Sequence, residues 1–155
     1  PFALEDGAGN TWQDEILVEV VQTGANLAVD HVELLEDEDG NDSVNPGEMA
    51  KVAVFVKNTG KSTAVGVRAE LEEEPVDFYY VSATRGDDLT YRGSYHNYCL
   101  YEYCVDILPS ETVDLVHVFF TVGQDASVGE YKFELTMQDG HGNTWLGQFL
   151  VEVVQ

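Results

Sequence analysis

The chain has 155 residues, 44% of them hydrophobic, which suffices for one domain with a core of its own. It carries 29 Asp and Glu residues against 7 Lys and Arg, for a formal net charge of −22. This balance excludes a nucleic-acid partner bound through its phosphates, and no apolar run is long enough to insert into a membrane as a helix.

The chain begins with a segment that it repeats at its end. Residues 5–22 read EDGAGNTWQDEILVEVVQ and residues 138–155 read QDGHGNTWLGQFLVEVVQ, with 12 of 18 positions identical at an offset of 133 residues. A self-match at a fixed offset indicates a repeat architecture. Asp-Gly followed closely by Gly-Asn, between alternating apolar runs, predicts a β-hairpin in both copies.

Residues 1–22 are therefore expected to form a hairpin arm, either the end of a preceding repeat or a strand donated to another chain. The outgoing strand is apolar on both faces in each copy, which predicts burial in the middle of its own sandwich or contact of one face with a neighbouring module or subunit. The arm residues expected at such an interface are Trp12, Ile16, Leu17, Val18, Val20 and Val21.

The main domain is expected over residues 23–155. Its pattern contains about eight strands separated by regularly spaced turns and no convincing helix, which predicts an all-β sandwich. The expected strands are Leu27–Glu36, Met49–Lys57, Ala64–Glu72, Val76–Thr84, Val105–Leu108 and Val113–Val122, followed by the terminal hairpin over residues 131–155.

An acidic loop of twelve residues, DEDGNDSVNPGE, lies between the first two of these strands at residues 37–48. Oxygen donors occupy loop positions 1, 3, 5, 7, 9 and 12, which is the ligand spacing of an EF-hand-type calcium loop. At position 6, where glycine usually makes the turn, the loop has Asp42, a residue type that tolerates this conformation better than most. We expect calcium as the cofactor, with an acidic surface turn as the alternative; the ligands would be Asp37, Asp39, Asn41, Ser43, Asn45 and Glu48.

An irregular segment rich in tyrosine covers residues 85–103. Exposed tyrosines on a loop can stack on a sugar ring or anchor a protein contact, because the ring buries area while the hydroxyl stays hydrated. Alternatively, the rings pack down and hold the long loop in place. The residues assigned to an interface here are Tyr95, Tyr98 and Tyr101.

The two cysteines of the chain, Cys99 and Cys104, have four residues between them. Pairing on a hairpin or tight loop would bring their Cα atoms within disulfide range. A metal site would need more Cys or His nearby, and a redox pair would have two residues between its cysteines. A structural disulfide is the favoured interpretation, and it implies an oxidising, extracellular location.

Two runs resemble the CARDB-type immunoglobulin-like domains, which recur in tandem in secreted and surface proteins of bacteria and archaea. One includes Asn45-Pro46-Gly47-Glu48 and Lys57-Asn58-Thr59-Gly60, and the other includes Pro109-Ser110-Glu111 and Gly142-Asn143-Thr144-Trp145. Ser110 stands where such domains often have glycine, and the tyrosine-rich segment looks inserted. The resemblance implies an immunoglobulin-like β-sandwich and an extracellular or cell-surface, modular setting, and it implies no catalytic activity.

No Ser/His/Asp or Cys/His set can be assembled from the residues, so we expect no enzyme. The favoured function is a structural repeat unit of an extracellular filament or surface stalk, linked head to tail to copies of itself through the duplicated hairpin and stabilised by calcium. The alternative is an accessory or adhesive module that recognises a glycan or a protein through the tyrosine-rich segment 91–103.

Overall fold

The computed structural model describes residues 2–14, 24–73, 75–85 and 104–155. No helix in this part of the chain is long and apolar enough to cross a membrane. Ten strands are present in these ranges: β1 (Phe2–Glu5), β2 (Thr11–Asp14), β3 (Leu27–Asp37), β4 (Met49–Asn58), β5 (Ala64–Glu73), β6 (Phe78–Arg85), β7 (Val105–Ile107), β8 (Thr112–Val122), β9 (Gly129–Gln138) and β10 (Thr144–Val153).

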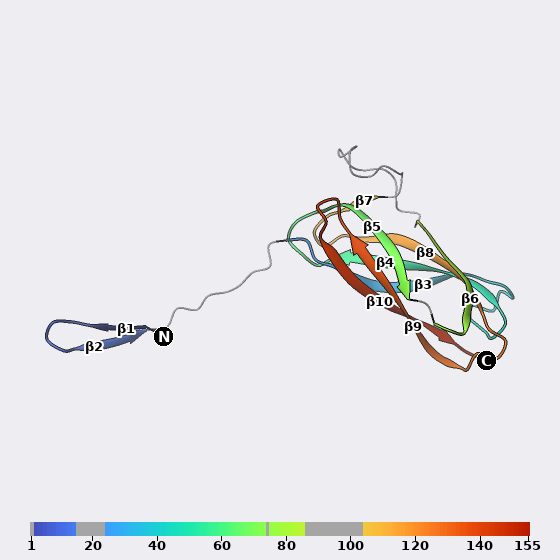
Figure 1. The fold of residues 1–155 in the computed structure, drawn as a ribbon, viewed down its shortest axis with the longest axis horizontal. Coiled ribbons are helices and arrows are strands. Elements are labelled where there is room, and N and C mark those ends of the chain that lie inside the picture. Colours follow the sequence, from blue (N-terminus) through green and yellow to red (C-terminus); the bar gives the residue numbers. More distant parts are fainter. Residues whose placement is uncertain (1, 15–23, 74, 86–103) are drawn as a thin grey trace.

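The strands form two four-stranded antiparallel sheets that pack face to face (Figure 1). One sheet has the order β10-β9-β5-β7 and the other has the order β3-β4-β8-β6, while β1 and β2 form a separate two-stranded sheet. The predicted all-β, immunoglobulin-like sandwich is thereby confirmed. One strand starts later than predicted: Val76 and Asp77 belong to a turn in which the Phe78 N–H donates to the Pro75 carbonyl at 3.0 Å.

The core lies between the two sheets and is built by alternation along their strands. On β9 the inward residues Phe133, Leu135 and Met137 are fully or almost fully buried, while the residues between them are only partly covered. Aromatic rings from both sheets meet there: Phe133 stacks on Phe149 with centroids 5.0 Å apart and contacts Phe78 edge-on at 5.1 Å. Such contacts stabilise the packing beyond the area that they bury.

The two strands that are apolar on both faces, β8 and β10, differ in their position in the sheets and in their burial. Strand β8 lies between β4 and β6 and is buried along almost its whole length, as expected for a central strand. Strand β10 is an edge strand, and its outward side chains Leu146 and Leu150 are 82% and 51% exposed. The expectation that this strand lies in the middle of its own sandwich is therefore wrong, because a two-layer sandwich covers only one face of each sheet.

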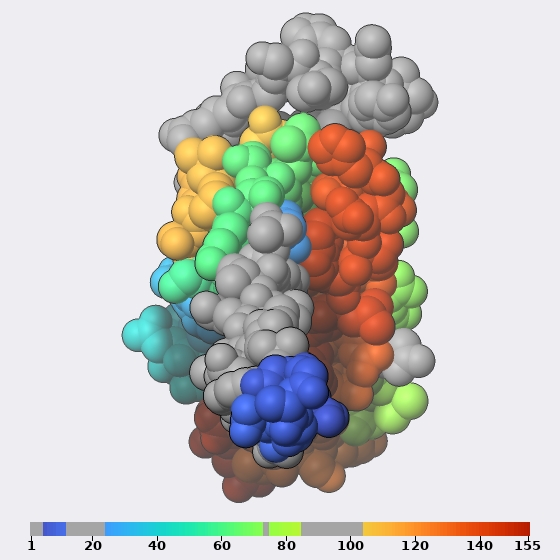
Figure 2. Space-filling view, turned by 90° about the vertical axis from the view of Figure 1, so that its left-hand side faces the viewer, coloured from blue at the N-terminus to red at the C-terminus, as the bar shows by residue number. Residues whose placement is uncertain are grey.

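The sandwich has two poles, at opposite ends of its strands. The N-terminal pole comprises residues 24–26, 58–63, 108–111 and 139–143, and the C-terminal pole comprises residues 38–48, 75–77, 123–128 and 153–155. Figure 2 faces the N-terminal pole, where the turn after β9 lies beside the start of β5; there the Gly140 N–H donates to the Val65 carbonyl at 2.7 Å. The chain thus enters the sandwich at one pole and leaves it at the other (Figure 1).

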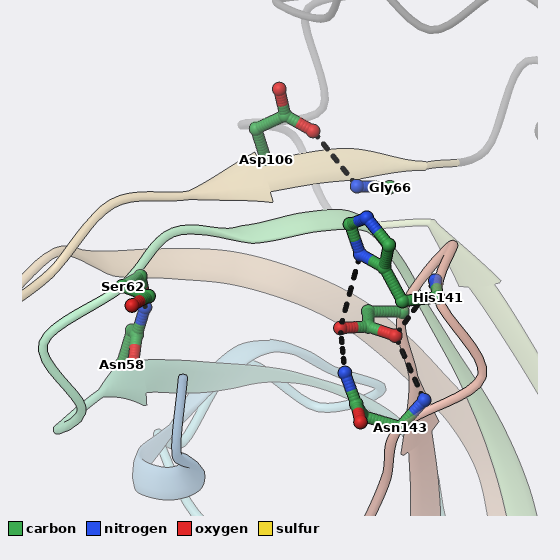
Figure 3. Close-up of polar contacts among 7 residues, drawn as sticks. Asn58, Ser62, Gly66, Asp106, His141 and Asn143 are labelled. Carbon is green, nitrogen blue, oxygen red and sulfur yellow. Dashed lines mark hydrogen bonds and ion pairs between the residues drawn. The ribbon is translucent and has the colours of Figure 1, made fainter. Parts of the chain in front are cut away.

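One buried amide ties the N-terminal pole together. The Asn58 side chain is fully buried, and its Oδ1 accepts from the backbone N–H groups of Asn26 at 3.1 Å and Gly60 at 3.0 Å. Its Nδ2 donates to the Ser62 carbonyl at 2.8 Å, beside which it lies in Figure 3. The same Nδ2 donates to the Ile107 carbonyl at 2.9 Å. A single side chain therefore satisfies backbone groups from the linker (residues 24–26, before β3), the β4–β5 turn and β7.

We expect Asn58→Ala to lower the free energy of unfolding by about 3 kcal/mol or more, because it leaves several backbone groups without partners at a buried site. Urea denaturation of the variant and the native chain measures this difference. Gln148→Ala, which removes an exposed amide from β10, is the matched control and should change stability by less than about 0.5 kcal/mol. Equal stability of the two variants would contradict the role assigned to Asn58.

Candidate metal centre

Three carboxylates come together in the acidic loop at the C-terminal pole. Asp37 ends β3, Asp39 lies within the loop and Glu48 immediately precedes β4; one oxygen of each lies within 4.8 Å of the others. Two oxygens bound to one calcium ion at the usual 2.3–2.6 Å can be at most about 5.2 Å apart. The spacing of the cluster therefore fits a single ion with all three carboxylates as ligands.

The loop backbone curls around the Asp37 carboxylate. Its Oδ1 accepts from the N–H groups of Gly40 and, at 3.1 Å, of Asn41, while its Oδ2 accepts from Asp42 at 2.9 Å. Asp39 Oδ1 also accepts from the Asn41 N–H at 3.1 Å. These bonds hold two negative charges near each other on a short loop, and a bound cation would relieve their repulsion.

Glu48 closes the loop from its other end. Its side chain is buried, with Oε1 accepting from the Asp39 N–H at 3.1 Å and Oε2 from the Asn45 N–H at 2.9 Å. Both carboxylate oxygens thus face the loop, as a bidentate ligand at position 12 requires. The buried carboxylate is oriented before any ion binds, which reduces the entropy lost on binding.

The three neutral donors of the predicted set are placed differently. The Asn41 Nδ2 donates to Asp39 Oδ2 at 2.8 Å and to Asn45 Oδ1 at 2.7 Å, so both amides are part of the cluster. Ser43 is half-buried and lines a hollow of about 250 Å³ between the loop and β10. The structure thus groups Asp37, Asp39, Glu48 and the two amides, and it places Ser43 on the β10 side of the loop.

The residue at loop position 6 has the backbone conformation that glycine usually supplies. Asp42 has a φ of 61°, inside the left-handed region. Short polar residues such as Asp adopt this conformation at a lower cost than β-branched residues, for which it is a true outlier. The difference from the usual calcium loop at this position is therefore one of residue type, while the residue has the left-handed conformation that glycine usually supplies.

The same loop is bonded to the end of β10. Val44 forms an isolated parallel bridge with Val153, and the Val154 N–H donates to the Val44 carbonyl at 2.9 Å. The Asn45 Nδ2 donates to the Val154 carbonyl at 3.1 Å. These contacts join residues 109 or 110 positions apart, so no local pattern in the sequence could have indicated them.

The two copies of the duplicated hairpin have the same turn. Asp6 Oδ1 accepts from the N–H groups of Ala8 at 2.8 Å and Asn10 at 2.9 Å, and Asp6 Oδ2 accepts from Asn10 Nδ2 at 2.8 Å. Asp139 makes the corresponding bonds at 2.9, 2.9 and 2.8 Å with His141 and Asn143 (Figure 3). The Asn10 amide is the main cause that lowers the pKa of the Asp6 carboxyl. The turn itself accounts for these polar residues.

Several predicted site residues lie outside the described part of the chain. The strand that holds Trp12 is described, but its side chain and the other arm residues at 16–21 are not. Tyr95, Tyr98 and Tyr101 and the cysteine Cys99 also lie outside these ranges, whereas Cys104 directly precedes β7. The interface assignments and the disulfide between Cys99 and Cys104 therefore stay predictions.

No protein-family model matches the chain, and no curated protein matches it. Among solved structures it is similar to a FixG-related protein from Vibrio parahaemolyticus, with 10% identity and a TM-score of 0.41, over 84% of this chain and 97% of that one. It is also similar to the CARDB domain of the PF1109 protein from Pyrococcus furiosus, in complex with di-metal ions, with 18% identity and a TM-score of 0.38, over 92% of this chain and 100% of that one. The similar structures thus include a CARDB domain, and CARDB is the family that the sequence resembles.

We expect Asp42→Val to destabilise the chain by about 1–3 kcal/mol, because a β-branched residue is strained at a positive φ. Asp42→Gly, which fits the same backbone without strain, should stay within about 1 kcal/mol of the native chain. Chemical denaturation of both variants in calcium-free buffer makes the comparison. A valine variant as stable as the glycine variant would contradict the left-handed conformation at this position.

Proposed function

We propose that this chain is a non-enzymatic structural unit of an extracellular filament or surface stalk. Its units join head to tail through the duplicated hairpin, and calcium stabilises the pole from which the chain leaves. The observation that carries the proposal is the duplication itself: one copy of the hairpin belongs to a sandwich sheet as β9 and β10, and the other forms the separate sheet of β1 and β2.

The arm hairpin repeats a hairpin of the sandwich, and its place in its own domain is taken by the terminal copy. In the terminal copy, β9 pairs with β5, and the inward side chains of both hairpin strands join the core. That place in the sandwich is filled, so the arm cannot occupy it within the same unit. An isolated two-stranded hairpin is marginal in water, which favours packing of residues 1–22 against another unit.

The positions of the two poles favour an extended arrangement. Asn26, next to the start of β3, is bonded at the N-terminal pole, whereas β10 ends at the C-terminal pole beside Val44. Units that are joined through opposite ends make heterologous contacts, which give an open string unless the rotation between units closes a ring.

The acidic loop has a position suited to stabilising such a junction. It is bonded to Val153 and Val154 at the end of the last strand, so an ion bound to Asp37, Asp39 and Glu48 would rigidify the point where the chain exits. A unit with a net charge of −22 also repels its neighbours, and bound cations weaken this repulsion.

The outer face of β10 supports contact between neighbouring units. Leu146 and Leu150 lie on the same face of this edge strand and are 82% and 51% exposed. Apolar side chains on an edge strand favour association with another chain, and the strand has no lysine or proline to prevent it. A disulfide between Cys99 and Cys104 would agree with the extracellular location that the proposal requires.

Calcium binding is the first test of the proposal. We expect chelator-treated protein to bind calcium in a calorimetric titration and its melting temperature to rise by about 5–10 °C, since ligand at a hundred times Kd adds about 2.7 kcal/mol of stability. Glu48→Gln should weaken binding at least about ten-fold. Asp125→Asn removes the same charge from another loop of this pole and should bind like the native chain. An absence of both heat and thermal shift would refute the calcium site.

Head-to-tail assembly is the second test. We expect the chain of residues 1–155 to sediment as extended oligomers and to appear as strings in electron microscopy, whereas a variant without residues 1–22 should stay monomeric. Both should have similar melting temperatures, because the sandwich of residues 24–155 does not use the arm. Leu146→Ser combined with Leu150→Ser should weaken assembly without unfolding the domain. A 1–155 chain that remains monomeric at high concentration would contradict the proposal.

A further inference from the structure

A second candidate site lies on the outer face of the β3-β4-β8-β6 sheet, near the C-terminal pole. A hollow of about 270 Å³ is bordered there by side chains of β3, β4, β6 and β8. Phe119 and Lys51 lie opposite each other in the register of β4 and β8, on the face away from the core. Tyr80 of β6 and Met49 of β4 border the hollow as well, and both are more than half exposed.

Tyr80 has a strained backbone conformation, and contacts of its own side chain do not offset the strain. Its φ is 54°, and its side chain is 90% exposed, so packing of the ring does not offset the strain. The pairing of β6 with β8 shifts register between Tyr79 and Ser82, which places Tyr80 in an irregular part of the strand. Strained residues gather at binding sites, where the surrounding structure holds them in place.

The neighbouring Tyr79 fixes the strand at this point. A Cβ added to Gly123 would lie only 3.0 Å from Tyr79 Cε2, so the ring packs directly on the glycine backbone. The Gly123 N–H also donates to the Asp77 carbonyl at 2.7 Å, just before β6 begins. The backbone is therefore held in place directly before Tyr80, while the Tyr80 ring itself is exposed to solvent.

The polar groups of the hollow combine acceptors with a donor. Lys51 Nζ lies 3.4 Å from Glu36 Oε1 and 5.0 Å from the centroid of the Phe119 ring. Glu38, which also borders the hollow, accepts from the Met49 N–H at 3.2 Å and keeps further lone pairs for a ligand. Carboxylates and an ammonium group thus lie beside an aromatic surface.

We propose that this hollow binds one pyranose ring of a neutral glycan, with a face of the sugar on the Tyr80 ring and its hydroxyls bonded to Glu36, Glu38 and Lys51. A hydroxyl both donates and accepts, so it suits a mixed set of carboxylates and an ammonium group. The carboxylates disfavour an anionic ligand, and the Lys51 ammonium group already occupies the place that a cationic ligand would take between Glu36 and the Phe119 ring. The volume lies just below the range of about 300–1,000 Å³ of drug-sized sites, which fits a single ring.

This site goes beyond the proposed structural role, and its sugar-binding groups are not the proposed calcium ligands. Asp37 belongs to both the acidic loop and the wall of the hollow, but the groups that bind the sugar are Tyr80, Glu36, Glu38 and Lys51. A filament built from such units would present one sugar site on each of them.

Saturation-transfer NMR on the 155-residue chain tests the proposal with the methyl pyranosides of glucose, galactose and mannose as probes. We expect transfer to the ring protons of at least one of them. Tyr80→Gly should weaken its binding at least about ten-fold, because it removes the stacking surface. Glycine suits the positive φ, so this variant should keep its fold. Transfer from none of the three probes, or native affinity in Tyr80→Gly, would overturn the proposal.

Further variants separate this site from its surroundings. Lys51→Met keeps an aliphatic chain over Phe119 and removes the donor, so it should weaken binding, whereas Lys132→Met, the same change on β9 of the other sheet, should not. Asp39→Ala removes a calcium ligand that does not border the hollow, and it should abolish the heat of calcium binding while sugar binding persists. Loss of sugar binding in Asp39→Ala, or native affinity in Lys51→Met, would contradict the assigned contacts.

Discussion

The buried amide of Asn58 is the constraint on which the N-terminal half of the sandwich depends. It accepts and donates four hydrogen bonds to backbone groups of the linker, of the β4–β5 turn and of β7. These segments are only partly paired through their backbones, as by the Thr59 N–H that donates to the Asn26 carbonyl at 2.7 Å. The buried backbone groups that remain need a side chain as partner. The entry point of the chain is thereby fixed relative to the core.

At the C-terminal pole, charged carboxylates have the part that the buried neutral amide of Asn58 has at the N-terminal pole. Three carboxylates and the amides of Asn41 and Asn45 share one loop, and the loop is bonded to the residues that follow β10. Backbone N–H groups stabilise the carboxylates only in part, because like charges remain close together. The order of this pole is therefore expected to depend on cations, whereas the N-terminal pole is complete without them.

The two outer faces of the sandwich offer different chemistry. The β10 face presents Leu146 and Leu150, which suits a neighbouring unit of the same kind. The opposite sheet presents Tyr80 beside Glu36 and Lys51, which suits a small hydroxylated ligand. Because these surfaces belong to different sheets, contact between units on one face leaves the other face accessible.

Periodicity and turn chemistry in the sequence determined the strands, the duplicated hairpin and the acidic loop, because each depends on residues that are close together in the chain. Alternation along residues 131–137 predicted the inward face of β9, and the oxygen spacing over residues 37–48 predicted which carboxylates meet. The tertiary structure alone decided that β10 is an edge strand, that Asn45 bonds Val154 and that Tyr80 lies beside Phe119 and Lys51. These contacts join residues far apart in the chain, and strand order and loop docking depend on the packing of both sheets, which no local pattern encodes.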